Sequence, residues 1–186
     1  MFIDIVEDLT LWEKSIQIYR DSFPLWERED ESIILKNIKN GSYKMFAYLK
    51  DKEVVGFYIL DINLGLDYAL FSFLAIKESH RALGLGSALC LSAIEYFHRH
   101  INCNWFFIEA EARQAKLYAK LGFKALELDY RVPAFNSKES IKMSLMLIEE
   151  KTIDTDSLRP IIQDIFLRGY SLDRDDIRLQ EQLKRI

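Results

Sequence analysis

The sequence of 186 residues is poor in cysteine, with only Cys90 and Cys103, and it has only three histidines. Two thiols cannot form the set of disulfides that holds small secreted domains together, so we expect both to be reduced. Nor do they supply the closely spaced cysteines and histidines that a structural zinc ion requires. The composition therefore predicts a core held by apolar packing, with no metal site.

Long hydrophobic runs are also missing. The longest, such as Val54–Leu60 and Ala69–Ile76, are too short to cross a bilayer. Near the N-terminus, Asp4, Glu7 and Asp8 stand where a secretory leader would be basic and then apolar. The net charge of −4 gives no general attraction to nucleic acid or to an anionic membrane. These absences predict a cytoplasmic protein without nucleic-acid or membrane partners.

What the sequence does contain is typical of a globular protein: 49% of its residues are hydrophobic and 29% are charged. A chain of this length fits one domain with a short appendage, and it is long enough to bury a core without disulfides. Because the pattern changes near residue 150, we expect one domain over residues 1–150 and a helical extension over residues 151–186.

The spacing of apolar residues predicts alternating strands and helices. Periods of three to four residues indicate helices, and alternation or short apolar runs indicate strands. The expected strands are 2–6, 45–49, 53–62, 68–76, 105–108, 123–128 and 141–148, and the expected helices are 12–23, 31–38, 84–100 and 112–121. This order predicts an α/β fold with a mixed, mostly antiparallel sheet flanked by helices, in which one β–α–β crossover follows an antiparallel meander.

The extension has its own apolar pattern. One helical face carries Leu158, Ile161, Ile162, Ile165, Phe166 and Gly169. Ser171 is placed to cap a second helix that carries Leu172, Leu179 and Leu183. Two interpretations remain open: the helices pack on their own domain, or they form a surface for a partner or for a homodimer.

The most informative segment runs from Phe73 to Leu89, where a strand leads through a short basic loop into a glycine pair and a helix. The glycines leave the backbone amides of residues 82–87 free to converge at a helix N-terminus, which suits a diphosphate. The same glycines would also suit a tight turn that lets the strand and the helix pack closely, and this is an alternative interpretation of the pattern. A dinucleotide site, with Glu109 on the ribose, would need a third glycine where Leu89 stands, and the meander before the loop argues against it.

A second segment, Ala112–Phe123, combines a short helix, a glycine stop and an aromatic residue that opens a strand. With this segment the chain resembles the Gcn5-related N-acetyltransferase (GNAT) superfamily over about residues 1–148. Arg81-x-x-Gly84-x-Gly86 matches one motif of that superfamily. Tyr118-x-Lys120-Leu121-Gly122-Phe123 matches its other hallmark.

The resemblance implies an acetyl-CoA site in a V-shaped opening between the strands that end near Ile76 and begin near Trp105. The pantetheine would pair with the first strand like an added strand, and the Ile76 amide would polarise the thioester carbonyl. The diphosphate would lie on the glycine loop. The implied cofactor-binding residues are Leu74, Ala75, Ile76, Arg81, Ala82, Leu83, Gly84, Leu85, Gly86 and Ser87.

The catalytic residues implied are Tyr118, Glu109 and Glu111. Tyr118 matches the family tyrosine that protonates the departing thiolate. The strand positions where many members carry the base are occupied by phenylalanines, so Glu109 and Glu111 are the nearest candidates. A further group of acids would border the acceptor site and favours a cationic acceptor: Glu27, Glu29 and Glu31.

We therefore expect an N-acetyltransferase that transfers an acetyl group to a primary amine, on a small molecule or a peptide, by direct attack on the thioester. The missing strand carboxylate leaves a second interpretation open, a non-catalytic acyl-CoA-binding or regulatory module on the same fold.

Overall fold

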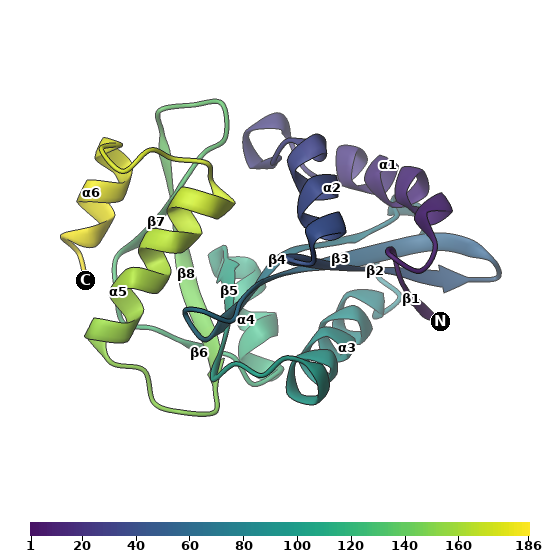
Figure 1. The fold of residues 1–186 in the computed structure, drawn as a ribbon. Helices are drawn as coiled ribbons and strands as arrows, with labels where there is room; N and C mark the ends of the chain where they lie inside the picture. The colour runs from purple at the N-terminus through teal and green to yellow at the C-terminus, as the bar shows by residue number, and fades with distance from the viewer.

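A computed structural model describes residues 1–186 and contains one mixed sheet. Its spatial order is β1-β2-β3-β4-β5-β8-β6, with β7 paired to β8 (Figure 1). All pairs are antiparallel except β4 with β5. The strands are β1 Phe2–Asp4, β2 Tyr43–Lys50, β3 Glu53–Asn63, β4 Tyr68–Ile76, β5 Trp105–Ala110, β6 Lys124–Ala125, β7 Tyr130–Pro133 and β8 Ser140–Glu149.

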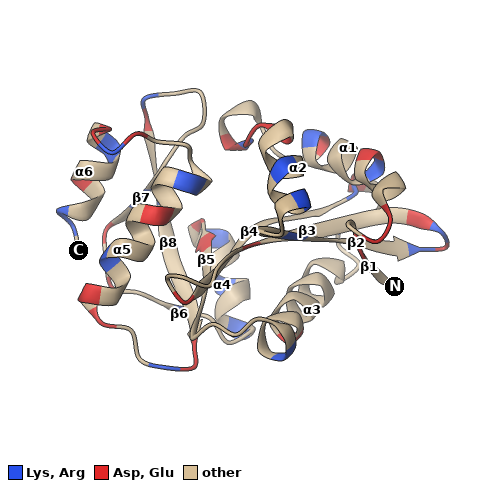
Figure 2. Cartoon of the chain, viewed as in Figure 1, with Lys and Arg blue, Asp and Glu red and all other residues tan.

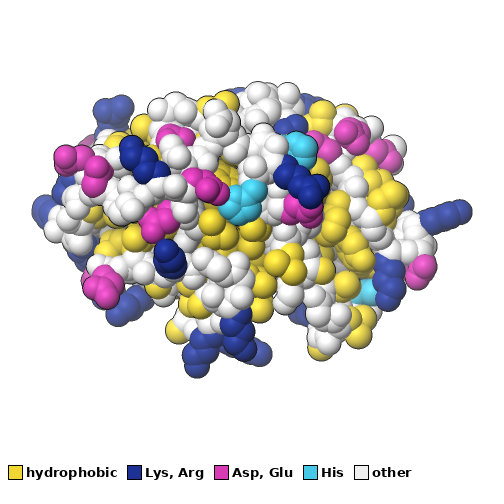
Figure 3. Space-filling view, turned by 90° about the horizontal axis from the view of Figure 1, so that it is seen from below, with side chains coloured by type: hydrophobic (Ala, Val, Ile, Leu, Met, Phe, Trp, Pro, Cys, Tyr) yellow, Lys and Arg dark blue, Asp and Glu magenta, His cyan; other side chains and the backbone are white.

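Helices cover both faces of this sheet. One face of the N-terminal half carries α1 (Trp12–Ser22) and α2 (Glu31–Asn40), and the opposite face carries α3 (Leu85–His100) and α4 (Ala112–Lys120) (Figure 1). The alternation within β5 explains why two layers are needed. Phe106 and Ile108 pack towards α3, whereas Trp105 and Phe107 pack on the other side. Each face is therefore apolar and must be covered. Figure 3 views the molecule from the side of α3 and α4, where charged side chains of both signs lie among hydrophobic ones.

The C-terminal helices, α5 (Thr155–Asp164) and α6 (Ile177–Leu183), lie over the C-terminal half of the sheet (Figure 1). The apolar face identified in the sequence is buried against strand residues such as Tyr68, Phe107 and Leu147. A π-helical turn, Ile165–Gly169, follows α5 directly. The extension thus shares a core with the sheet, and the face considered for a homodimer is occupied within the chain.

The predicted α/β class and element order are confirmed, with two local corrections. The expected strand 123–128 is wrong in extent: β6 spans only Lys124–Ala125, and a separate β7 follows after tight turns at Leu126 and Leu128. The expected cap at Ser171 is also wrong. Ser171 has φ +52°, outside the extended conformation of a capping residue, and Asp176 caps α6 by accepting from the Arg178 amide. None of the helices combines the length and apolar character needed to cross a bilayer.

Candidate active site

The parallel strands β4 and β5 separate part-way along the sheet. Their pairing runs only from Tyr68–Trp105 to Phe71–Ile108. At that point β4 contains a bulge at Ser72, because Leu60 pairs with Phe71 while the adjacent Ile59 pairs with Phe73. A bulge bends its strand and ends regular pairing. The end of β4 therefore has a free edge on the side of β5.

The amides on that free edge point into the opening. Lys77 donates its amide to the Val55 carbonyl of β3 at 2.9 Å. Since successive residues of a strand direct their backbone groups to opposite edges, Leu74 and Ile76 direct theirs away from β3. On the opposite edge of β4, Gly56 lets β3 approach β4 closely, because a Cβ on Gly56 would lie 2.9 Å from the Ala75 carbonyl oxygen.

The glycine loop leaves a row of unused amides at the start of α3. No side chain caps this helix, and the first of its amides with an acceptor is that of Ala88, which donates to the Gly84 carbonyl at 3.2 Å. Gly84 has φ +75°, which glycine adopts without strain. The amides of residues 82–87 have no acceptor in the chain. Together with the helix dipole they present a surface whose chemistry suits an anion.

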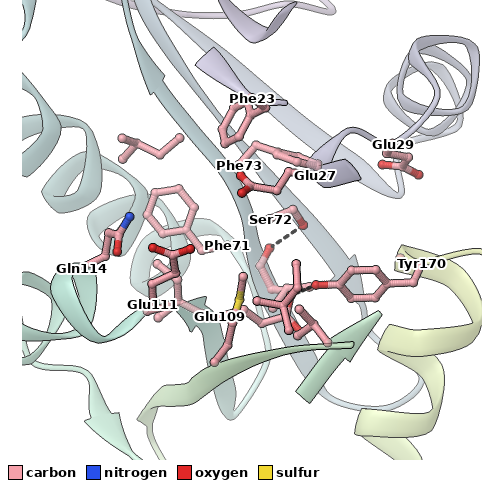
Figure 4. A pocket seen from close by; sticks show the side chains of 18 of the residues that line it. Phe23, Glu27, Glu29, Phe71, Ser72, Phe73, Glu109, Glu111, Gln114 and Tyr170 are labelled. Atoms are coloured by element: carbon pink, nitrogen blue, oxygen red, sulfur yellow. Dashed lines mark hydrogen bonds between the residues drawn. The ribbon is translucent and has the colours of Figure 1, made fainter. Parts of the chain in front are cut away.

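A cavity of about 420 Å³ continues from the opening into the molecule. Its walls come from the ends of β4 and β5, from α4, from the α1–α2 connection, from the strands β7 and β8 with their connection, and from the C-terminal segment. Figure 4 shows Glu27 and Glu111 pointing into it, with Tyr170 entering from another side. Most lining residues are apolar, and aromatic rings are prominent: Phe23, Trp26, Tyr43, Phe71, Phe73, Tyr118, Phe135 and Tyr170.

Apart from its tyrosines, the ionisable side chains of this cavity are all acidic. They are Glu27, Glu29, Glu109 and Glu111, and no lysine, arginine or histidine lines it. Figure 2 shows acidic positions in the α1–α2 connection and at the end of β5. Burial, and then the charge of Glu111, raise the pKa of Glu27. Burial raises the pKa of Glu29 to about 8, although Tyr43 donates a hydrogen bond to its carboxylate.

Glu109 is held on both oxygens. Tyr130 donates to Oε1, and Tyr170 donates to Oε2 at 2.6 Å. Burial raises the pKa of Glu109, and the two phenol donors act in the opposite direction because they stabilise the carboxylate. The side chain lines the cavity, so the lone pairs that the tyrosines do not use remain available to a bound molecule.

Tyr118 projects from α4 into the same cavity. Its ring meets that of Phe123 edge-on at 6.0 Å, and its hydroxyl has no hydrogen-bond partner in the chain. Burial raises the pKa of Tyr118 to about 12, with a smaller contribution from Cys90. A neutral phenol directed into a cavity, with no partner of its own, is free to donate a hydrogen bond to a bound group.

Family comparison identifies the class of protein to which this site belongs. The statistical model of the acetyltransferase (GNAT) family matches residues 12–123, more than half of the chain. The chain belongs to the GNAT acetyltransferase family. The resemblance expected from the two motifs is therefore confirmed. No curated protein sequence matches the chain significantly.

Solved GNAT structures share the fold at low identity. A protein described as a GNAT-family acetyltransferase from Bacteroides thetaiotaomicron has a TM-score of 0.76 at 18% identity, covering 93% of this chain and 99% of its own. A variant of spermidine N-acetyltransferase SpeG from Vibrio cholerae has a TM-score of 0.60 at 20% identity, and the match covers 80% of this chain and 94% of that protein. Arabidopsis thaliana NAA60 in complex with acetyl-CoA has a TM-score of 0.59 at 19% identity, and the match covers 81% of this chain and 98% of that protein.

The structure separates the predicted site residues. Ile76 lies on the free edge of β4, whereas Ala75 pairs with Phe57 and directs its backbone groups to β3 rather than into the opening. Leu74 and the acids Glu109 and Glu111 line the cavity with Tyr118, whereas the glycine-loop residues lie outside it at the start of α3. Arg81 is occupied elsewhere, because its guanidinium donates to the Ile76 carbonyl at 3.1 Å and to Ser22 Oγ at 3.3 Å. That contact ties the loop to the end of β4.

The sequence pattern missed several residues of the candidate site. Tyr130 and Tyr170 contact Glu109 from elements distant in the chain. Trp26 and Phe135 line the cavity from two loops, and the Phe135 amide donates to the Trp26 carbonyl at 2.8 Å. One local signal for this part of the site was the group of acids beginning at Glu27. Of that group Glu31 lies outside the cavity, in an ion pair with Arg20.

Proposed function

We propose that this acetyltransferase transfers the acetyl group of acetyl-CoA to a primary amine on a cationic acceptor. The observation that carries the proposal is the juxtaposition of two unlike surfaces. One is the strand edge and amide loop that suit a diphosphate with an extended arm. The other is a cavity whose charged side chains are all acidic. The two meet where Leu74 and Tyr118 line the cavity.

The cofactor half of the site fits acetyl-CoA by its chemistry. Bound acetyl-CoA supplies an acetyl thioester, whose carbonyl carbon is the electrophile. The free amides of residues 82–87 would hold its diphosphate, and the space beside Gly86 is open, because a Cβ added there meets no atom within 4 Å. The free edge at Leu74 and Ile76 would pair with the amide groups of the pantetheine. The complex of NAA60 with acetyl-CoA supports this choice of donor.

Residues where the two surfaces meet can act on the thioester carbonyl and on the departing sulfur. The Ile76 amide, directed into the opening, would donate to the oxygen on which negative charge develops. Tyr118 would donate to the departing sulfur. With its pKa at about 12, and that of a thiol at ~8.5, Tyr118 acts by hydrogen bonding rather than by complete proton transfer.

The acceptor amine must lose a proton before or during attack. A lysine-like amine with a pKa of ~10.4 costs about 4.6 kcal/mol to deprotonate at pH 7, so a base is needed. We assign this role to Glu109, which is held in place by two donors, with Glu111 as the alternative at the exposed end of the cavity.

The remaining acids would attract the positive charge of the acceptor. Burial raises the pKa of Glu27 and the charge of Glu111 adds to that rise, so a cation bound between the two carboxylates would relieve their repulsion. Aromatic faces of Trp26 and Phe73 line the same space and favour cations. Spermidine, the acceptor in the name of the Vibrio cholerae relative, belongs to this class.

The test begins with thermal unfolding in the presence of acetyl-CoA, CoA and NAD. A true ligand at about 100 times its Kd stabilises by about 2.7 kcal/mol, so we expect the CoA compounds, and not NAD, to raise the melting temperature. Acetylation is then measured with spermidine, 1,4-diaminobutane, a neutral-side-chain peptide with a free α-amine, and a lysine peptide. We expect the polyamines to have the highest kcat/KM.

Matched variants separate the acceptor from the cofactor. Glu27→Gln and Glu111→Gln should raise the KM for the amine and leave that for acetyl-CoA unchanged, whereas the exposed Glu127→Gln should change neither. CoA binding without turnover of any amine would instead support the non-catalytic module. The engagement of both Glu109 oxygens by tyrosines is the observation that favours that second candidate.

A further inference from the structure

The C-terminal segment reaches the cavity through one side chain. Tyr170 follows the π-helical turn Ile165–Gly169, and its amide donates to the Ile165 carbonyl. Its ring stacks on Phe135 at 5.2 Å and meets Phe166 at 5.8 Å. Two aromatic neighbours and the hydrogen bond to Glu109 fix the direction of the hydroxyl. The wider π turn re-aims the chain after α5, a feature often found at functional sites.

An ion pair two residues earlier anchors this segment. Arg168 donates to the carboxylate of Asp61, a fully buried residue of β3, and also to Asp164 at 2.9 Å. Tyr68 donates to Asp164 at 2.7 Å, which connects the group to β4. A buried carboxylate must keep its partner, so this cluster holds the π turn in one position against the sheet.

We propose that Tyr170 is a positioning residue for Glu109, so that the segment after residue 150 forms part of the catalytic centre. The inference rests on the proposed role of Glu109 as the base. Tyr130 and Tyr170 approach different oxygens of the carboxylate from β7 and from the C-terminal segment. Together they fix its plane and leave its unused lone pairs towards the cavity, where the acceptor amine would bind.

The surroundings of Glu109 make the effect measurable. Besides its two tyrosines, the ionisable groups near this carboxylate are acidic or phenolic: Glu27, whose charge acts on Tyr170, Glu111 beyond the end of β5, and Tyr68, whose charge acts on Tyr130. No cation lines the cavity. The phenol donors are therefore the groups that hold down the pKa of Glu109 against burial.

The experiment titrates Glu109 directly and in catalysis. In the full-length protein labelled with carbon-13 at the glutamate carboxyl carbons, the Glu109 signal is identified by its loss in Glu109→Gln. Tyr170→Phe should raise the pKa of this carboxyl by about one unit. Because a base must be deprotonated, the acidic limb of kcat/KM for spermidine, or for whichever amine of the panel is the best substrate, should move up in pH equally.

Two further variants keep the test sharp. Tyr48→Phe, on β2 and outside the cavity, removes an equivalent hydroxyl and should move neither titration. Should Tyr170→Phe loosen the segment, 3-fluorotyrosine at position 170 keeps the ring and donates more strongly. It should then lower the pKa of Glu109 and shift the acidic limb down.

The outcomes separate this inference from the proposed function. An active wild type whose carboxyl titration and acidic limb are both unmoved by Tyr170→Phe would overturn the role of Tyr170 alone. A wild type that acetylates none of the amines, or a Glu109→Gln variant with full activity, would overturn the role of Glu109 and, with it, this inference.

Discussion

Arg168 and Asp61 lie 107 residues apart in the sequence, yet Arg168 Nη2 contacts both carboxylate oxygens of Asp61 at 3.0 and 3.2 Å. Asp61 is fully buried, and burial raises its pKa to about 6 even though the arginine opposes that shift. The pair joins the C-terminal segment to the central strands. It therefore connects overall stability to the placement of Tyr170.

Removing Arg168 should destabilise the protein in a pH-dependent way. Arg168→Met leaves an uncompensated charge on Asp61 and should cost about 3 kcal/mol at pH 7. Because the arginine holds the pKa of Asp61 down to about 6, Asp61 should take up its proton at a higher pH in the variant. The loss should therefore shrink as the pH falls towards about 6 and level off below it. Urea unfolding at two pH values measures both effects. Adding Asp61→Asn to Arg168→Met should restore part of the stability, and failure of that restoration would argue that the arginine acts by packing alone.

Glu29 should make the protein less stable as the pH rises. Its pKa in the folded protein is about 8, whereas that of an unperturbed glutamate is 4.5, so between these limits the folded state holds a proton that the unfolded chain has lost. The free energy of unfolding should fall over this window. Glu29→Gln should flatten the dependence of the melting temperature on pH. The exposed Glu127→Gln should leave the slope as in the wild type.

Tyr118→Phe should separate catalysis from folding. The hydroxyl has no partner in the chain, so its removal should leave the melting temperature unchanged or slightly higher. If it donates to the departing sulfur, kcat should fall about 100-fold with little change in the KM for either substrate. Unchanged turnover in this variant would assign Tyr118 to packing.

The glycine loop can be tested with a control of matched conformation. Gly84 and Gly41 have φ of +75° and +84°, and neither has an atom within 4 Å of an added Cβ. A side chain at either position therefore carries a similar strain of about 1–2 kcal/mol. Gly84→Glu should also block the amide surface and weaken CoA binding, measured by calorimetry. Gly41→Glu, at the end of α2, should leave the affinity unchanged.

The sequence by itself determined the features that depend on short stretches of chain. The two family motifs, the helix that starts after Gly84 and the strand that begins at Trp105 each depend on residues close together in the chain, and the family, the helix and the strand were all confirmed. The same local reasoning failed at Ser171, where the chain takes a left-handed conformation. It also failed after β6, where tight turns replace the expected strand.

Tertiary structure alone decided which side chains meet at the cavity and at the ion pair that anchors the C-terminal segment. Tyr170 reaches Glu109 across 61 residues and Arg168 reaches Asp61 across 107. Spacing patterns tell which face of an element is apolar, and they carry no information on which polar groups will satisfy one another across elements. Buried polar groups must find partners wherever the packing places them. The family was thus in the sequence, whereas the environment of the proposed base came from the fold.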